Sequence, residues 1–266
     1  MAIEIFFPYA RIFRIPVFGA TLKQSKNAGF DGVECHFIGD LLHEKNVIDV
    51  REEAYELDLK LRFHQGWSWR SGQRIWQNAV LRPLGALVPI DQPYAEQTRF
   101  AHNDPVVMYG NVAHTVQQPN YIFQTTSEFE DGKKYVSSIS DFIPIMTEDK
   151  LPVVFDTQHI LEWNFNTPSV AGLPDNPKEL GNTLCALWRI MSPYAKEIHF
   201  CDCVPTLGSA QGRNVYPGTG VLPLQEFAAE VRQSGWNGII TPEVAPQHVR
   251  KDKILGSLSD MIRSIF

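Results

Sequence analysis

Three short apolar runs in the C-terminal part of the chain end in side chains that favour metal ions, and this pattern constrains the fold most. The segments that carry them are Val153–His159, Glu197–Asp202 and Gly238–Glu243. Each suits a short buried strand with its polar group at the C-terminal end. A parallel β/α barrel assembles its active site from such strand ends. Carboxylates and imidazoles that converge there suit Mn²⁺, Mg²⁺, Co²⁺ or Zn²⁺, so the pattern predicts a metal-assisted enzyme.

Strand-like and helix-like segments alternate along the whole chain. The expected strands are Ile3–Phe7, Gly32–Cys35, Leu61–His64, Leu87–Ile90, Val106–Tyr109, Val153–Asp156, Glu197–His199 and Gly238–Glu243. The expected helices are Phe18–Ala28, Val47–Leu57, Gly72–Leu81, Tyr94–Phe100, Lys133–Glu148, Lys178–Met191, Leu224–Gln233 and a last one from about Val249. Parallel strands joined by right-handed helical crossovers close into a (β/α)8 barrel. We therefore expect residues 1–266 to form a single α/β barrel domain.

The stretch from Ser68 to Asp131 leaves two strand assignments open. In the first, Val106–Tyr109 is the fifth strand and an irregular loop follows it to about Asp131. In the second, Tyr121–Gln124 is the fifth strand. The choice decides which side chain the fifth strand brings to the site.

The composition excludes several kinds of partner. A net charge of −6 without any block of Lys or Arg argues against nucleic acid. Residues 1–7 lack the basic region of a signal peptide, and no apolar run approaches the roughly 18 residues of a membrane helix. The four cysteines form no CxxC pair, so we expect buried, reduced thiols in a cytoplasmic protein. Assembly into a homo-oligomer is compatible with this sequence.

Four motifs occur in order along the chain: NAGFDGVE (27–34), FDTQH (155–159), HFCD with the later GR and PGTG (199–220), and GWNG leading to a glutamate (235–243). Together they resemble the motifs of the xylose isomerase-like barrels. That group contains sugar and sugar-phosphate isomerases and epimerases, hydroxypyruvate isomerases, inosose dehydratases and endonuclease IV. The resemblance implies a xylose isomerase-like barrel, one divalent ion and a small carbohydrate-like substrate.

The resemblance also implies roles for individual residues. Asp156, His199 and Glu243 would bind the ion, and Glu243 would also act as acid or base. His159 and Arg213 would contact substrate oxygens, with His159 close to the reacting atoms. The planar charged fork of Arg213 suits a hydroxyl, a carboxylate or a phosphate.

Three further residues are candidates for substrate contact. His64 ends the third expected strand, at a position that often lines the pocket in the family. Glu34 ends the second strand, where hydrogen bonding to neighbouring side chains is an equal alternative. Trp67 follows His64 in a loop, where it would either stack on a sugar face or pack over the barrel mouth.

The chain departs from the family at the end of the fifth strand, where the isomerases carry a glutamate that is both a ligand and an acid or base. The positions available here are Tyr109–Asn111 in the first assignment and Gln124 in the second. Gln124 would offer the ion a carbonyl oxygen, but an amide carries no charge and shuttles no proton. Glu128 and Glu130 are the nearest replacements in sequence. We therefore expect weak or no activity on ordinary ketohexoses.

The leading hypothesis is a metal-dependent isomerase or epimerase of a sugar, a sugar acid or a related hydroxy-carbonyl compound. A dehydratase or lyase needs the same polarised carbonyl and only one base. A phosphodiesterase of the endonuclease IV kind is disfavoured by the acidic charge and by Gly212 and Asn214, which flank Arg213 where that enzyme carries an Asp-x-His pattern. The last alternative is a non-catalytic sugar-binding barrel that has lost its fifth-strand glutamate.

Overall fold

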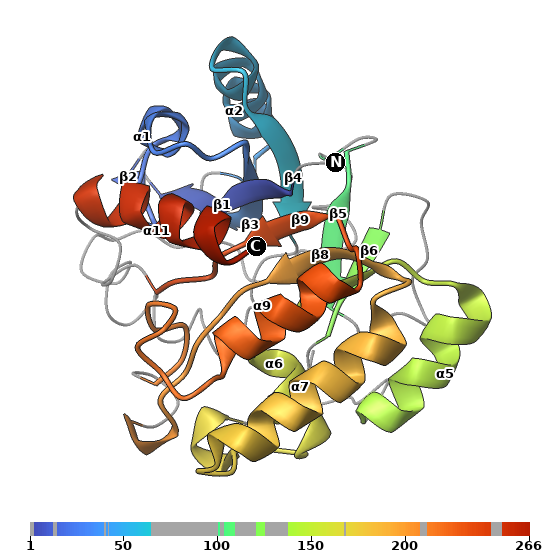
Figure 1. Ribbon diagram of the computed structural model, residues 1–266. Helices are drawn as coiled ribbons and strands as arrows, with labels where there is room; N and C mark the ends of the chain where they lie inside the picture. The colour runs from blue at the N-terminus through green and yellow to red at the C-terminus, as the bar shows by residue number, and fades with distance from the viewer. Residues whose placement is uncertain are drawn as a thin grey trace, which may run out of the picture.

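Eight parallel strands close into a barrel in the computed structural model (Figure 1). The structure describes residues 3–12, 15–39, 41, 43–64, 101, 104–109, 121–125, 138–167, 169–207, 212–245 and 252–266. The barrel strands are β1 (Glu4–Ile12), β3 (Gly32–Gly39), β4 (Lys60–His64), β5 (Val106–Tyr109), β6 (Tyr121–Gln124), β7 (Val153–Asp156), β8 (Ala195–His199) and β9 (Ile239–Thr241). Pairing of Glu4 with Ile239 closes the ring between β1 and β9. The short β2 (Ile15–Pro16) is added antiparallel to β1.

Helices pack around the outside of the barrel (Figure 1). The described helices are α1 (Leu22–Asn27), α2 (Glu44–Glu56), α5 (Ile139–Asp149), α6 (His159–Asn164), α7 (Pro177–Met191), α9 (Leu224–Gln233) and α11 (Asp252–Ile265), with short 3-10 turns at η5 (Val170–Gly172) and η6 (Pro205–Leu207). None of these helices has the length and apolar character needed to cross a bilayer.

The longest helix, α7, shows how the sequence specifies these elements. The side chain of Asn176 caps it by accepting a hydrogen bond from the backbone N–H of Glu179, and Pro177 occupies the first turn, where its missing N–H costs nothing. Leu180, Leu184 and Trp188 recur on one face and are fully buried. This face packs on the barrel, where the Trp188 ring meets Phe155 of β7 edge-on at 5.3 Å.

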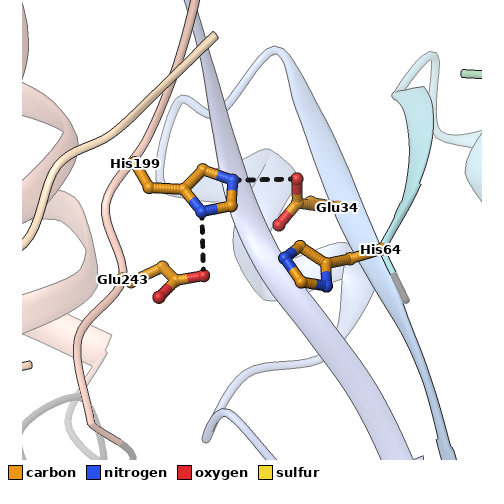
Figure 2. Close-up of side chains that lie close together, drawn as sticks. All are labelled: Glu34, His64, His199 and Glu243. Carbon is orange, nitrogen blue, oxygen red and sulfur yellow. Dashed lines mark hydrogen bonds and ion pairs between the residues drawn. The ribbon is translucent and has the colours of Figure 1, made fainter. Parts of the chain in front are cut away.

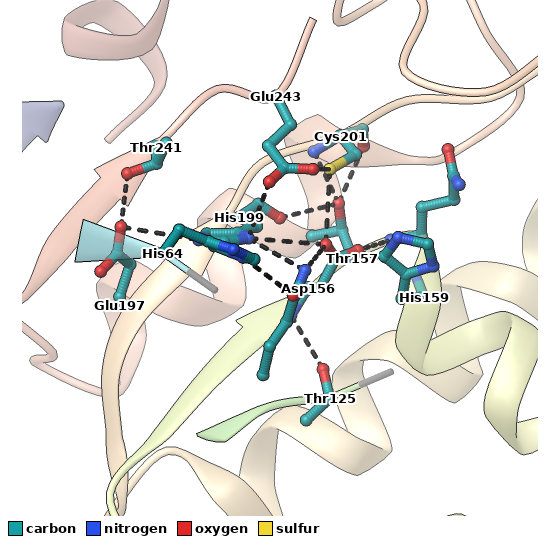
Figure 3. Close-up of polar contacts among 12 residues, drawn as sticks. His64, Thr125, Asp156, Thr157, His159, Glu197, His199, Cys201, Thr241 and Glu243 are labelled. Carbon is teal, nitrogen blue, oxygen red and sulfur yellow. Dashed lines mark hydrogen bonds and ion pairs between the residues drawn. The ribbon is translucent and has the colours of Figure 1, made fainter. Parts of the chain in front are cut away.

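Because neighbouring side chains in a strand point to opposite sides, the outward direction of Phe155 fixes the inward direction of Val154 and Asp156. Val154 accordingly joins Val107 and Ile122 in a small separate apolar cluster inside the barrel. A buried ion pair between Arg62 and Glu197 lies in the same interior, and Glu197 also accepts a hydrogen bond from Thr241 (Figure 3).

The structure confirms the predicted (β/α)8 barrel and corrects the fifth strand. Val106–Tyr109 is the fourth barrel strand, because Val107 pairs directly with His64 of the third strand. Tyr121–Gln124 is therefore the fifth strand, as in the second assignment, and the irregular loop expected across it is wrong. The strand expected at 87–90 lies outside the described residues, as do the helices expected at 72–81 and 94–100. The single-domain assignment stays a prediction.

Candidate metal centre at the barrel mouth

The imidazole of His199, at the end of β8, is surrounded by carboxylates. Its Nδ1 lies 3.1 Å from Glu243 Oε1, and its Nε2 lies 3.2 Å from Glu34 Oε2 (Figure 2). The same Nδ1 lies 3.7 Å from Asp156 Oδ2. His199, Glu34 and Asp156 are fully buried, and Glu243 is 13% exposed. Burial alone would lower the pKa of His199, but the charges of Glu34 and Glu243 raise it well above its ordinary value. The metal-free ring is therefore a cation held between anions.

Gln124 occupies the position of the missing fifth-strand glutamate. Its Oε1 lies 3.1 Å from His64 Nε2, and its Nε2 donates a 2.9 Å hydrogen bond to Asp156 Oδ2. The same Nε2 is 3.1 Å from His199 Nδ1. Burial, together with the nearby His36, lowers the pKa of His64 to about 4, so this ring is neutral at pH 7, the form that binds metals.

Asp156 ends β7 and is held by the backbone that follows it. Its Oδ1 accepts hydrogen bonds from the N–H groups of Gln158 at 2.9 Å and His159 at 2.7 Å. Burial acts to raise the pKa of Asp156, but His159, His199 and these hydrogen bonds outweigh it and bring the pKa down to about 2. The carboxylate is thus ionised and fixed in orientation.

Glu162, on α6, binds both residues that were expected to contact substrate. Arg213 makes a two-pronged ion pair with it, with Nε 3.1 Å from Oε1 and the terminal nitrogen 2.8 Å from Oε2. His159 Nδ1 lies 2.8 Å from the same Oε2. Burial works against charging His159, yet the carboxylates of Asp156 and Glu162 raise its pKa to about 10. Two fixed cations therefore lie next to the carboxylate centre.

Cys201, two residues beyond His199, also lies at the centre (Figure 3). Its Sγ is 3.8 Å from Asp156 Oδ2 and 3.9 Å from Glu243 Oε2. Burial and these two carboxylates raise the pKa of the thiol, so it is protonated in the metal-free protein. The expectation of a buried reduced thiol agrees with this position.

Asp202, from the same sequence motif, supports the loop that follows. Its Oδ2 accepts N–H bonds from Gly218 and Gly220, both at 2.9 Å, and its Oδ1 accepts from Leu222 at 3.2 Å and Cys203 at 2.8 Å. A Cβ on Gly220 would lie 2.2 Å from Asp202 Oδ1. The PGTG glycines thus let the backbone turn around a buried carboxylate.

The structure brings most of the predicted site residues together. The described members of the centre are Glu34, His64, Gln124, Asp156, His199 and Glu243. His159 and Arg213 lie beside them, while Trp67, Glu128 and Glu130 fall outside the described residues. Sequence reasoning did not single out Glu162. The only signal was a glutamate one helical turn after His159 in an otherwise apolar helix.

The donors present fit a divalent ion. Ligand atoms of Glu34, His64, His199 and Glu243 all lie within 4.8 Å of one another, and so do those of Asp156, Cys201 and Glu243. Two ligand atoms on one ion at about 2.1 Å are at most about 4.2 Å apart, so the first group would have to contract to close onto an ion. Buried carboxylates and neutral imidazoles are ligands of Mn²⁺, Co²⁺ and Zn²⁺.

Fold and centre together define a β/α barrel with a buried site able to hold a metal ion. The chain belongs to the xylose isomerase-like TIM barrel family, whose model matches residues 117–265. No curated protein matches the chain significantly.

Solved structures share the fold at low sequence identity. A xylose isomerase domain protein from Planctomyces limnophilus superposes with a TM-score of 0.59 at 13% identity, over 99% of this chain and 96% of that one. A D-psicose 3-epimerase from Clostridium cellulolyticum H10 gives 0.53 at 13% identity, over 99% of both chains. An AP endonuclease of family 2 from Brucella melitensis gives 0.56 at 12% identity, over 97% and 98%. At these identities the likeness shows the fold alone.

Proposed function

We propose that this protein is a metal-dependent isomerase or epimerase of a small sugar, sugar acid or related hydroxy-carbonyl compound. The observation that carries the proposal is the buried group of carboxylates around His199 at the C-terminal ends of the strands, where β/α barrels carry their active sites. The similar structure of a D-psicose 3-epimerase, crystallised with D-tagatose, supports the substrate class.

His199, Glu243 and Asp156 are the first ligands of the ion in this proposal, and the neutral amide of Gln124 adds no charge to them. A bound ion would polarise a carbonyl and its neighbouring hydroxyl, and so acidify the C–H bond between them. Glu243 is the base that takes this proton and returns it. It is ionised, because the charge of His199 outweighs burial and lowers its pKa, and its side chain is more exposed than those of Glu34, Asp156 and Glu197, the other carboxylates around His199.

His159 and Arg213 hold the substrate in this proposal. Both carry positive charge beside Asp156 and both are fixed by Glu162, so they offer preset donors to substrate hydroxyl or carboxylate oxygens. The side chains of His159 and Arg213 are 12% and 28% exposed, which leaves them accessible to a bound molecule.

A dehydratase or lyase acting on the same substrate class is the second candidate. The observation that favours it is that Glu243 is both negatively charged and partly exposed to a bound molecule, whereas Glu34 and Asp156 are fully buried. Elimination needs one base, while proton transfer between two faces of a sugar needs two opposed groups.

Exchange of a substrate C–H proton with solvent tests the proposal even where the product is unidentified. We expect the protein loaded with Mn²⁺ or Co²⁺ to catalyse deuterium uptake from D2O, followed by NMR, into at least one compound in a panel of sugar acids, cyclitol ketones and ketohexoses. Glu243→Gln should lower the rate by about 10²–10⁴-fold, the usual contribution of a general base. Glu179→Gln, at an exposed position on α7, is the control and should leave the rate unchanged.

Metal analysis of the purified protein separates the remaining classes. One ion per chain with deuterium exchange supports the proposal. Three ions with phosphodiester cleavage would point to endonuclease IV-like chemistry. A chain that binds sugar but neither retains an ion nor catalyses exchange is a non-catalytic barrel, and the proposal is then wrong.

A further inference from the structure

We propose that Glu34, in the second barrel strand, supplies the negative charge that Gln124 lacks and binds the ion as a direct ligand beside His64, His199 and Glu243. This inference rests on the metal centre of the proposed function. It assigns to Glu34 a role different from the substrate contact expected at that position.

Gln124 is poorly placed to act as the missing anion. Its amide carries no charge, and both ends of the amide already have buried partners, His64 at 3.1 Å from Oε1 and Asp156 at 2.9 Å from Nε2. Turning the carbonyl oxygen toward an ion would require breaking these contacts in a buried site. The fifth strand therefore contributes a bridge between neighbouring side chains.

Glu34, by contrast, is a fully buried carboxylate with an oxygen that makes no hydrogen bond to a described residue. Within the described part of the chain, its Oε1 has no hydrogen-bond partner, and neither ring nitrogen of the adjacent His36 has one. His36 Nε2 lies 3.3 Å from this Oε1 without the alignment of a hydrogen bond. A buried carboxylate oxygen left in this state is costly, and a cation is the partner that would compensate it.

Glu34 lies beside His199 and His64, where a divalent ion would require a further anionic ligand (Figure 2). Its ligand atom belongs to the four-residue group that lies within 4.8 Å, together with two imidazoles and Glu243. Once His199 has released its proton on binding, two carboxylates and two neutral imidazoles balance the charge of a divalent ion. Asp156 requires a cation less than Glu34 does, because backbone N–H groups and Gln124 already donate hydrogen bonds to both of its oxygens.

The test removes the carboxylate from position 34 on the second strand and introduces one at position 124 on the fifth strand. Full-length protein, stripped of metal with a chelator, is titrated calorimetrically with Mn²⁺. We expect Glu34→Gln to weaken Mn²⁺ binding at least 100-fold and the double variant Glu34→Gln/Gln124→Glu to recover to within 10-fold of the wild type. Glu44→Gln, at an exposed position on α2, is the control and should bind as the wild type does.

Three results would overturn the inference. Binding by Glu34→Gln within threefold of the wild type shows that the carboxylate is not a ligand. A double variant as weak as the single one shows that Glu34 acts only by orienting His199, a role typically worth about 10–100-fold in affinity. A wild-type protein that binds neither Mn²⁺ nor Co²⁺ removes the proposed function together with the inference, whereas the first two results leave that function standing.

Folding is checked in the same series. Gln is nearly isosteric with Glu, but it removes one of the anions around the buried His199 cation, so the metal-free Glu34→Gln protein should melt lower than the wild type and still unfold cooperatively. If that variant nevertheless fails to fold, Glu34→Asp keeps the charge but shortens the side chain, and it should weaken Mn²⁺ binding at least 10-fold. Unchanged affinity in Glu34→Asp would then overturn the inference.

Discussion

Glu162 is the residue that sets the charge beside the candidate centre. One buried carboxylate holds two cations, with His159 2.8 Å and the Arg213 terminal nitrogen 2.8 Å from the same oxygen. Its α6 position, one turn after His159, and the 51-residue separation from Arg213 mean that only the folded barrel brings the three together. Glu162 is therefore a positioning residue for both expected substrate contacts.

Replacing Glu162 should lower the pKa of His159 toward its ordinary value. With Glu162→Gln, one of the two carboxylates that raise the pKa of His159 to about 10 is lost, so NMR titration of the imidazole should give a value at least about one unit lower. Glu179→Gln serves as the exposed control. An unchanged His159 titration in the Glu162 variant would show that Asp156 alone fixes its charge.

The same shift makes stability depend on pH in a defined direction. The pKa of His159 is higher in the folded chain than the ordinary value of about 6.5, so protonation stabilises the fold fully below pH 6.5, and this contribution is lost as the pH rises toward 10. Urea unfolding should show the wild type exceeding Glu162→Gln most at pH 6, with the difference narrowing toward pH 10. A difference that widens with pH would contradict this assignment.

The sequence predicted the site residues that lie at the C-terminal ends of strands. It did not predict the contacts that a residue makes with partners distant in the sequence. Asp156 and His199 are the last residues of β7 and β8, and Glu243 follows β9, so the barrel geometry alone directs them to one place. Cys201 was expected as a buried thiol, and nothing local to its position indicated contacts with Asp156 and Glu243. Such contacts arise from packing between separate strands.

At the scale of elements, the turn from Tyr216 to Leu222 is held by a single carboxylate. Asp202 accepts four backbone N–H bonds, and the missing side chain of Gly220 leaves the space that this carboxylate fills. The glycine is required here by close approach of the backbone, since a Cβ would also lie 2.3 Å from the carbonyl oxygen of Cys203.

Two glycine substitutions should therefore have opposite effects on the free energy of unfolding. Gly220→Ala forces the turn away from Asp202 and should destabilise the protein by about 2 kcal/mol or more. Gly256→Ala lies inside α11 with nothing within 4 Å of the new Cβ, and it should stabilise by about 0.5–1 kcal/mol. Denaturant unfolding measures both, and a neutral Gly220→Ala would show that the turn does not depend on this contact.

The fifth strand shows where element prediction from sequence ends. Val106–Tyr109 and Tyr121–Gln124 are both four-residue apolar runs, and each forms a strand. Their order in the ring follows from pairing, with Val107 opposite His64 on one side and Phe123 opposite Val153 on the other. Strand pairing is non-local, so the local sequence pattern identified both segments as strands but did not give their order in the barrel.

For the whole molecule, closure of the ring pairs the first barrel strand with the last. β1 pairs with both β3 and β9, so the first and last strands stabilise each other. We propose on this basis that residues 1–266 unfold as one domain. Calorimetry should give a single transition whose calorimetric and van't Hoff enthalpies agree, whereas two resolved transitions would indicate separate units.

Metal binding should stabilise the whole barrel, because the ligands come from strands near both ends of the chain. Glu34, His64, His199 and Glu243 belong to the second, third, seventh and eighth strands or their ends, so one ion would tie together segments that separate on unfolding. At 100 times the dissociation constant, binding adds about 2.7 kcal/mol, which for a chain of this size is a rise of about 5–10 °C in Tm. We expect Mn²⁺ or Co²⁺ to produce this rise, a chelator to reverse it and Glu243→Gln to reduce it. An ion that binds stoichiometrically without raising Tm would have to bind the unfolded chain equally well, which would place its ligands outside this centre.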